Sequence, residues 1–526
     1  MTGFMWPSCH VKSQNMERSV ENPFKQGRPK WISYAKAIGI VSLFLCVVSI
    51  FDGTGRTSTP PTTTPTTNKD SSLLKLKTTK DVVEKTDNIK PPGTIQQIDQ
   101  LKQLRDGIVQ DEDEGTGSDD QEEDDESSES EDVFPLLKQD EYLPWLRNYY
   151  QSLEFKTHHK HYHIDDKKLD PPLILKSLRM GCNYIVENQI EGIGIFNYQY
   201  NFVTKQMDTS DSPVRQAAIE DGLKFFRKHM VDGPMEGSRM IKYPNSEESQ
   251  SGVNALYGLA IIDFIRTMVD YDLTHTSDIV IPIEELKVQL KGTIKFLKYM
   301  QNDDLHFSKE YNFKKASKSK ESSSYYDGET MLCLVKAAKY MDGYNNLIPR
   351  IEKAAPIMAK AYTVDVWRTD RHDSDKTKGF YQWSSMFFTE YYLAKWENYE
   401  CYGDYVIILA HWIIHTHGIL NRKRNTGYAF EGIISAFKIA EIRGHEDALL
   451  DLGYTIDEGL YKLGGWQVNG PLSHTNEYLV KHPIDDVLAN GGVMNARNQA
   501  ELRIDTTQHQ MHALIMADKF IYNKDE

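Results

Sequence analysis

The sequence predicts an all-α fold, an (α/α)6 toroid of helical hairpins that follows a transmembrane helix and a disordered stalk. Three observations support this prediction. Apolar residues recur every three or four positions after Tyr142, glycine- and aromatic-rich clusters recur between these segments, and an uncharged apolar run precedes them at Ala37–Phe51. The chain therefore divides into a cytosolic tail (1–30), a transmembrane anchor (31–51), a stalk (52–132) and a luminal helical domain (133–526).

Composition excludes several classes of protein. The 526 residues are 40% hydrophobic, which is enough apolar material for a substantial core. The formal net charge of −15 argues against a nucleic-acid partner, because such proteins present a basic face. Cys182, Cys333 and Cys401 form no CxxC or Cys/His cluster, so neither a disulfide scaffold nor a metal site is predicted. No Walker loop, nucleotide fingerprint or GxSxG elbow occurs, and no cofactor is predicted.

The anchor is predicted from length and flanking charge. Trp31 to Phe51 is interrupted by charge only at Lys36, and about 20 apolar residues span a bilayer. Arginines and lysines gather before the segment and are sparse after it, which places the N-terminus in the cytosol and gives a type II topology. We expect a Golgi or other secretory-pathway membrane. A buried core helix is the alternative interpretation of this segment.

Two low-complexity stretches predict the disordered stalk. Thr57–Thr67 is a Thr/Pro tract, and such tracts stay extended and often carry O-linked sugars. The acidic run from Asp111 to Asp132 has no aromatic residue and repels itself. The acidic run is interpreted as a solvating spacer, with calcium or partner binding as the alternative.

Helical periodicity then continues to the end of the chain. The spacing predicts eleven helices, at Leu173–Asn188, Gln216–Met230, Val253–Val269, Ile283–Gln301, Glu329–Met341, Pro349–Thr363, Ser385–Trp396, Tyr405–His417, Tyr428–Arg443, Glu446–Leu463 and Thr506–Phe520. No stretch alternates with period two over several strands, so the domain is predicted to be all-α.

Glycine and aromatic residues cluster between the predicted helices. Examples are Tyr325–Gly328 (YYDG), Gly379–Trp383 (GFYQW) and Gly464–Gln467 (GGWQ). Several clusters are separated by about the length of one helical hairpin, which fits one aromatic turn per repeat on a common rim. The repeats are degenerate, which favours a closed ring over an open solenoid.

Paired helices with aromatic turns resemble the six-hairpin toroids of glycosidases, polysaccharide lyases and related carbohydrate-active enzymes, over roughly residues 165–520. The resemblance implies a sugar-binding cleft at one end of the ring. Leu502–Leu514 (LRIDTTQHQMHAL) is in addition similar to the closing segment of the C-terminal domain of D-glucuronyl C5-epimerases. Arg503, Asp505, Thr507 and His509 match that segment, whereas Thr506 stands where the family has a catalytic tyrosine. The β-rich domain that precedes the helical domain in this family is not seen in the sequence.

Aromatic residues with polar neighbours are the candidates for sugar binding. Flat apolar faces stack on sugar rings, although the same residues are the largest contributors to any core. The predicted substrate-binding residues are Tyr198, Tyr200, Tyr326, Asp327, Gln382, Trp383, Trp466 and Arg503. Arg503 is included because a guanidinium can clamp a carboxylate with two hydrogen bonds.

Four residues are the candidates for acid–base catalysis. Tyr428 and Glu431 lie three positions apart, and Asp505 and His509 lie four apart, so each pair shares one helical face. Such pairs suit proton transfer. The alternative interpretation is that Asp505 caps the last helix and that His509 is a core residue. An acidic residue near a helix start, such as Asp327, is likewise favoured by the helix dipole alone.

The favoured function is modification of a uronic-acid-containing polysaccharide by a C5-epimerase-like isomerase, which moves a proton at C5 without a cofactor. Two alternatives stay open. One is a glycoside hydrolase or lyase, with Asp327 or Glu329 paired with Glu431 or Asp505. The other is a glycan-binding protein without catalytic activity. The predicted partners are accordingly a glycan substrate and a membrane, and no nucleic acid.

Overall fold

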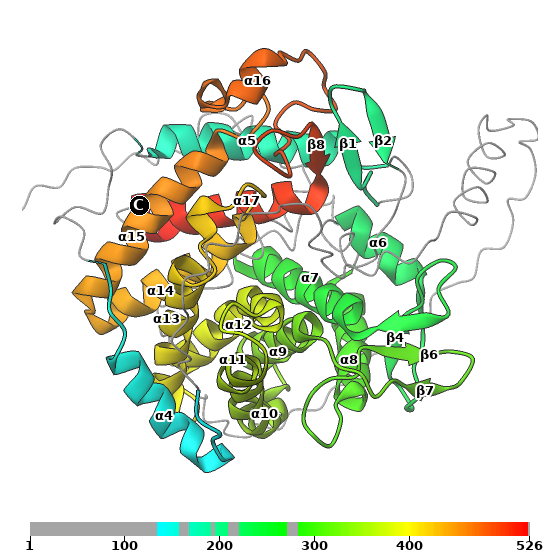
Figure 1. Cartoon of the computed structure of the whole chain (residues 1–526). Helices are drawn as coiled ribbons and strands as arrows, with labels where there is room; N and C mark the ends of the chain where they lie inside the picture. The colour runs from blue at the N-terminus through cyan, green and yellow to red at the C-terminus, as the bar shows by residue number, and fades with distance from the viewer. Residues whose placement is uncertain are drawn as a thin grey trace, which may run out of the picture.

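The computed structural model describes residues 134–156, 167, 169–190, 195–208, 220–270 and 282–523 (Figure 1). The predicted cytosolic tail, anchor and stalk lie outside these residues and stay predictions. The described chain is dominated by helices, as the periodicity predicts.

Five buried helices form an arc in which each packs against the next. In order they are α7 (Ser251–Asp270), α9 (Ser324–Tyr340), α12 (Asp375–Ala394), α14 (Gly427–Arg443) and α17 (Ile504–Ala517). Most residues of these helices are buried, and their side chains make up much of a single hydrophobic core. We call them the inner helices.

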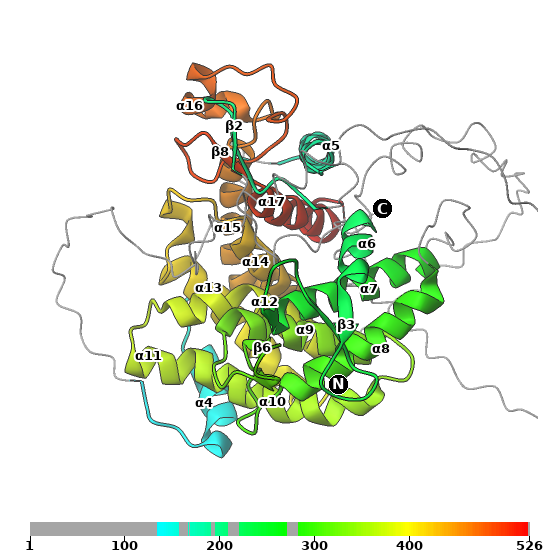
Figure 2. The same cartoon turned by 90° about the vertical axis from the view of Figure 1, so that its right-hand side faces the viewer.

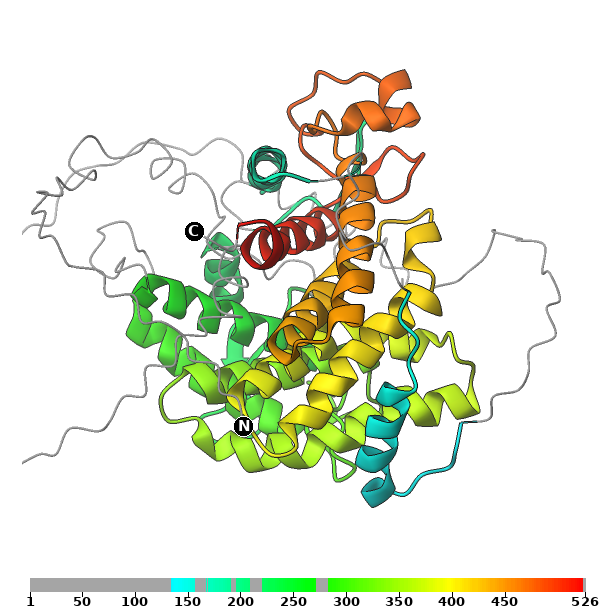
Figure 3. The ribbon, with the colours of Figure 1, turned by 90° about the vertical axis from the view of Figure 1, so that its left-hand side faces the viewer.

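Each inner helix has a partner on the outside of the arc. The pairs are α7 with α8 (Ile283–Met300), α9 with α10 (Ile348–Lys360), α12 with α13 (Tyr399–His415), α14 with α15 (Glu446–Gly464), and α17 with α5 (Pro171–Glu187). Figures 2 and 3 show α5, from the start of the domain, beside α17 at its end. The described residues thus form five helical pairs. Closure into a ring of six stays a prediction.

Shorter helices surround this arrangement. α4 (Gln139–Gln151) packs on α13 and α10, and α6 (Glu220–Lys228) packs on α7. α11 (Val366–Thr369) and α16 (Glu477–Lys481) lie in the connections. α6 falls within the predicted helix Gln216–Met230, whereas α4 and α16 are not among the helices predicted from the sequence.

Small antiparallel sheets lie in the connections, where the sequence analysis predicted no strands. They are β2–β1–β8, β3–β4 and β5–β6–β7, formed by β1 (Gln199–Asn201), β2 (Gln206–Asp208), β3 (Met230–Asp232), β4 (Arg239–Ile241), β5 (Glu248–Gln250), β6 (Glu310–Asn312), β7 (Ser317–Lys318) and β8 (Glu501–Arg503). Strands of two or three residues are too short to show an alternating pattern. The pairing of Tyr200 with Leu502 ties the start of the domain to the chain just before α17.

Two aromatic clusters predicted as turns lie inside helices. α9 begins at Ser324 rather than Glu329, and α12 at Asp375 rather than Ser385. Their glycines serve close helix packing: a Cβ on Gly328 would lie 2.7 Å from the Cβ of Trp383. A glycine in a helix interior is therefore a contact point here and not a turn signal.

Among the described helices, α7 alone is long and apolar enough to cross a bilayer, and 83% of its apolar window is buried within the fold. A buried inner helix passes the same test of length and composition.

Candidate active site

The candidate residues gather toward the N-terminal ends of the inner helices. Along the sequence, an outer helix lies between each inner helix and the next and returns the chain to the starting end, so the inner helices run in the same direction. Glu329 of α9, Gln382 of α12, Glu431 of α14 and His509 of α17 all lie in the first half of their helices. One end of the arc therefore carries most of the predicted site.

Glu431 is the centre of this group. Its Oε1 accepts hydrogen bonds from Nδ1 of His509 at 3.1 Å and from Nδ1 of His512 at 2.9 Å. Its Oε2 accepts a hydrogen bond from the side-chain amide of Gln382. The predicted residues Gln382, Glu431 and His509 therefore converge, although they come from three helices.

The charges of this group stabilise each other. Burial raises the pKa of Glu431, but His509 and His512 outweigh burial and bring this pKa down to about 2. Burial lowers the pKa of His509, and the Glu431 carboxylate reverses this effect and raises it. Glu431 is therefore a carboxylate at neutral pH, and His509 carries a proton more readily than a free imidazole does.

Hydrogen-bond geometry fixes how His509 is oriented. Nδ1 faces Glu431, and the amide of Gln382 lies 3.0 Å from the same nitrogen. The hydrogen on Nδ1 points at the Glu431 carboxylate. Nε2, the other ring nitrogen, forms no hydrogen bond with a described residue and can therefore face a substrate. The His509 side chain is 29% exposed, against 1% for Glu431. This carboxylate–imidazole pair is the arrangement of an oriented general base.

His512 is the deeper of the two histidines. Its side chain is 10% exposed, and its Nε2 is buried without a hydrogen-bond partner among the described residues. It lies three residues after His509 on α17, so helical spacing places both rings on the same carboxylate.

Arg503 and Asp505 bind each other. Nε of Arg503 donates to Oδ1 of Asp505 at 3.1 Å, and a terminal nitrogen donates to Oδ2 at 2.6 Å. The guanidinium also lies 5.5 Å from the ring centre of Tyr198. The predicted clamp for a substrate carboxylate is thus already occupied by Asp505, whose charge also helps to raise the pKa of His509.

Glu329 is a buried carboxyl without a hydrogen-bonded Oε2. Its side chain is 2% exposed, and no described residue donates to Oε2. That oxygen and the ring of Tyr326 fill the space beside Gly252 of α7, where a Cβ would lie 2.3 Å from each. Burial raises the pKa of Glu329 to about 8. The side chain is therefore a neutral acid at pH 7, able to donate a proton.

Asp327 faces away from solvent into a separate cluster. Its Oδ2 lies 2.6 Å from Nδ1 of His306 and accepts a hydrogen bond of 2.6 Å from Tyr362. Its Oδ1 accepts from the backbone amide of Phe307 at 2.7 Å. The carboxylate is fully buried, so in this structure it holds the loop before α9 in place and contacts no solvent.

The predicted aromatic residues fall into two groups. Tyr200 and Trp466 are 3% exposed and belong to the core, which leaves no open ring face on either. Tyr326, Trp383 and Tyr198 are partly exposed. Trp383 follows Gln382 on α12, and its Cβ lies against Gly328 of α9, next to Glu329 in sequence. These half-buried rings are the candidates for sugar stacking.

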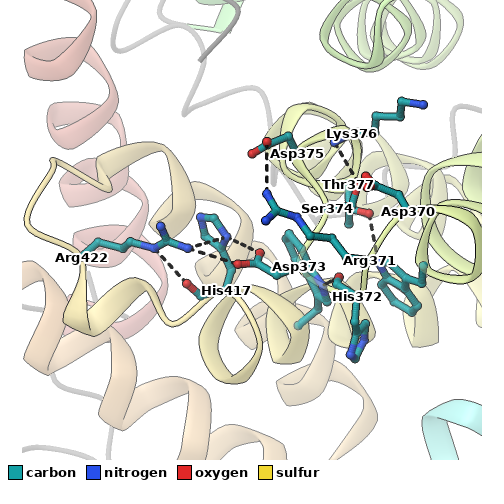
Figure 4. A network of polar contacts seen from close by, with 12 residues as sticks. Asp370, Arg371, His372, Asp373, Ser374, Asp375, Lys376, Thr377, His417 and Arg422 are labelled. Carbon is teal, nitrogen blue, oxygen red and sulfur yellow. Dashed lines mark hydrogen bonds and ion pairs between the residues drawn. The ribbon is translucent and has the colours of Figure 1, made fainter. Parts of the chain in front are cut away.

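Asp373, whose charge acts on the Tyr428 phenol, belongs to a polar network in the segment that leads into α12 (Figure 4). There His417 and Arg422 contact the carboxylate of Asp373 at 2.6 and 3.3 Å. Burial and the nearby carboxylate of Asp373 raise the pKa of the Tyr428 phenol above its usual range, and Arg422 opposes them. Tyr428 is therefore protonated at neutral pH.

Sequence reasoning missed the partners of Asp327 and the protonated state of Glu329. His306 and Tyr362 reach Asp327 from other segments, and no local pattern links them. His512 was not missed, because its spacing in the sequence continues the helical row of Asp505 and His509. A cavity of about 230 Å³ lined by Val468, His474, Leu479, His482 and neighbouring residues contains none of the predicted site residues.

No protein-family model matches the sequence, and no curated protein matches it either. Among solved structures, a GH76 α-mannanase of Bacteroides thetaiotaomicron is similar, with 10% identity and a TM-score of 0.43, over 65% of this chain and 95% of the mannanase. A D-mannose isomerase is similar with 11% identity and a TM-score of 0.42, over 66% of this chain and 97% of the isomerase. The chemistry of the site rests on its own geometry.

Proposed function

We propose that this protein is a carbohydrate-modifying enzyme that catalyses proton transfer at a sugar carbon, with His509 as the general base. The contact between His509 and Glu431 carries this proposal. It supplies an imidazole oriented by a buried carboxylate, with one nitrogen left for a substrate. General acid–base catalysis needs a group placed in this way.

The site residues divide the work of such a reaction. His509 removes a proton from carbon, and the electron pair of the broken C–H bond moves onto the adjoining carbonyl or carboxylate group. Glu431 stabilises the imidazolium that forms. Tyr428, one turn before Glu431 and protonated at neutral pH, is assigned the return of a proton to carbon. The imidazolium of His509 then loses its proton to solvent and the Tyr428 phenolate regains one from solvent, so the proton count is unchanged over the cycle and no oxidant or reductant is required.

Two features support a sugar as the substrate. Tyr326 and Trp383 are half-buried rings, Tyr326 beside Glu329 and Trp383 next to Gln382 in sequence, and ring faces of this kind stack on sugars. The closing segment around Arg503–His509 is similar to that of D-glucuronyl C5-epimerases. C5-epimerisation of a uronate within a polysaccharide is the specific form of the reaction that we propose. Because Asp505 occupies Arg503, this form needs another cation to neutralise the uronate carboxylate.

Solvent exchange tests the proposal. The full-length protein is incubated in deuterated water with glucuronate- and mannuronate-containing polymers and with neutral glycans, and deuterium bound to carbon is measured by mass spectrometry. We expect incorporation with the wild type and a loss of about a hundredfold or more for His509→Ala, as for removal of a general base. His474→Ala, an exposed histidine elsewhere, is the matched control and should keep full exchange. No exchange with any glycan would refute a proton-transfer enzyme, and glycan binding without exchange would favour a non-catalytic glycan-binding protein.

A glycoside hydrolase is the second candidate, and Glu329 favours it. A carboxyl group that is neutral at pH 7 suits protonation of a leaving-group oxygen. Both oxygens of Glu431 are engaged and Asp505 is bound to Arg503, so the carboxylate that would activate water is not provided by the predicted residues. Release of reducing ends that depends on Glu329 and not on His509 would select this function over the first.

We further propose that the chain is a type II membrane protein of the Golgi or another secretory membrane, with the helical domain in the lumen. The apolar run at 31–51 and its basic flank support this topology. Protease protection on intact vesicles tests it: residues 133–526 should be cleaved only after the membrane is permeabilised.

A further inference from the structure

Two short segments near the start of α14 bring basic residues together. Lys423 and Arg424 precede α14, and Arg497 lies in the connection that leads to β8; all three are exposed. Arg424 pairs with Ala496 in an antiparallel bridge, and the amide of Arg497 donates to the carbonyl of Lys423 at 2.9 Å. Lys423 and Arg497 therefore lie opposite each other, and like charges in that position are unfavourable.

Lys462 of α15 adds a cation beneath this pair. Its Nζ donates to the carbonyls of Leu420 and Arg422 at 2.8 and 2.7 Å. Burial and, to a lesser extent, the positive charge of Arg497 lower the pKa of Lys462 to about 8, against the opposing charge of Glu458. The segment before α14 thus lies in a positive field.

The surrounding carboxylates do not balance these charges. Asp373 is engaged by Arg422 and His417 (Figure 4). Glu458, whose charge acts on Lys462, lies 3.5 Å from Lys167. Within the described chain, Lys423, Arg424 and Arg497 have no ion pair. We call these three residues the basic rim.

The basic rim is joined to the candidate active site. Asn425, directly after Arg424, donates through its side chain to Oε1 of Gln510 at 3.3 Å and accepts from the amide of Gly427 at 2.8 Å. Gln510 follows His509, and Gly427 precedes Tyr428. A chain of sugars that extends from His509 toward this side would therefore meet the three cations.

We propose that Lys423, Arg424 and Arg497 bind the acidic groups of an anionic glycan whose reacting sugar lies at His509. The proposal rests on the proposed function, because the position of His509 is what makes the ligand a glycan. Carboxylate and sulfate groups share the recognised chemistry, so the source of the negative charge is decided by the test. Arg503 is bound to Asp505 and is not available to neutralise an acidic group of the substrate. The three cations of the basic rim, which have no ion pair within the described chain, supply that positive charge.

Calorimetric binding to the full-length protein tests this proposal. The probes are oligogalacturonate, which carries only carboxylates, dextran sulfate oligomers, which carry only sulfates, and uncharged dextran. The rim variant carries three substitutions together: Lys423→Gln, Arg424→Gln and Arg497→Gln. The control variant is Lys287→Gln, Lys291→Gln, Lys314→Gln, which changes the net charge equally at exposed positions elsewhere.

We expect the wild type and the control variant to bind at least one anionic oligomer and to bind dextran weakly. The rim variant should bind that oligomer at least about fivefold more weakly at low salt, as the loss of several exposed charge pairs implies. The difference should vanish near 1 M salt, where the Debye length is about 3 Å. The rim variant should melt no lower than the wild type, because it loses a like-charge pair.

Several outcomes would overturn the proposal. These are equal binding by the rim variant and the wild type, an equal loss in the control variant, and equal affinity for dextran. Rim-dependent binding of an RNA oligonucleotide without binding of either anionic oligomer would also overturn it. Failure of the proposed function is separable: a wild-type protein that binds an anionic oligomer through the rim without any deuterium exchange refutes only the catalytic proposal.

Discussion

At the residue scale, two buried glutamates on inner helices differ in charge at neutral pH: Glu431 is ionised and Glu329 is neutral. Two histidines and an amide surround Glu431, and the two histidines bring its pKa down to about 2 despite burial. Glu329 is almost as deeply buried but has no cation beside it, so burial alone raises its pKa to about 8. The difference lies in the neighbours, because both side chains are removed from water to a similar degree.

Because the pKa of Glu329 is raised, we expect the free energy of unfolding to depend on pH. The folded state holds this proton more tightly than the unfolded chain, whose carboxyl has a pKa near 4.5. The stabilising effect is complete below about pH 4.5 and is lost as the pH rises toward 8. We expect Glu329→Gln to gain stability over the wild type across that range, by up to about 1.4 kcal/mol per pH unit.

Urea unfolding at a series of pH values measures this gain. Glu284→Gln, at a side chain that is 82% exposed, is the matched control and should show no such trend. A constant difference between Glu329→Gln and the wild type from pH 5 to pH 8 would contradict the assignment of a neutral Glu329.

At the element scale, glycines allow neighbouring helices to approach closely. A Cβ on Gly459 of α15 would lie 1.9 Å from the ring of Phe430 on α14, and one on Gly432 would lie 2.5 Å from the hydroxyl of Tyr381 on α12. Phe430 and Tyr381 are almost fully buried, so neither ring has room to move. These contacts hold α14, and with it Glu431, in a fixed position between its neighbours.

Gly459→Ala should therefore destabilise the domain, although alanine favours a helix by about 1 kcal/mol over glycine. Overpacking of a filled core costs about 1–3 kcal/mol, so we expect a net loss in the free energy of unfolding. Adding Phe430→Leu, which removes the ring that the new methyl group meets, should recover part of the loss in a double-mutant cycle. Additive effects of the two changes would contradict direct contact between them.

At the scale of the whole molecule, the beginning and end of the domain are tied together. α5 packs on α17, β1 pairs with β8, and α4 packs on α13 and α10. Tyr142 of α4 is fully buried, and its hydroxyl lies 3.2 Å from that of Thr363. α4, which directly follows the predicted stalk, is therefore part of the folded domain.

Tyr142→Ala should lower the free energy of unfolding by about 3–5 kcal/mol, as removal of a buried aromatic side chain does elsewhere. Leu136→Ala, at a side chain that is 75% exposed in the preceding segment, is the control and should change little. Thermal and urea unfolding of the full-length protein measure both. A stable Tyr142→Ala protein would show that α4 contributes little to the core.

The sequence by itself determined the helical class and the position of most helices, because an apolar stripe depends only on residues three or four apart. It also placed Tyr428 with Glu431 and Asp505 with His509, since each pair shares one helix. Where a local cue had two meanings the prediction failed: the glycines of YYDG and GFYQW suggested turns and instead allow α9 and α12 to pack.

Only the tertiary structure decided which of these residues meet. Glu431 and His509 are 78 positions apart, and their contact depends on α14 and α17 lying side by side. The same long-range packing occupies Arg503 with Asp505, buries Asp327 against His306, and leaves Glu329 neutral. The charge state and exposure of a side chain depend on all of its neighbours in space. Periodicity along the chain gives no information about neighbours that belong to another helix.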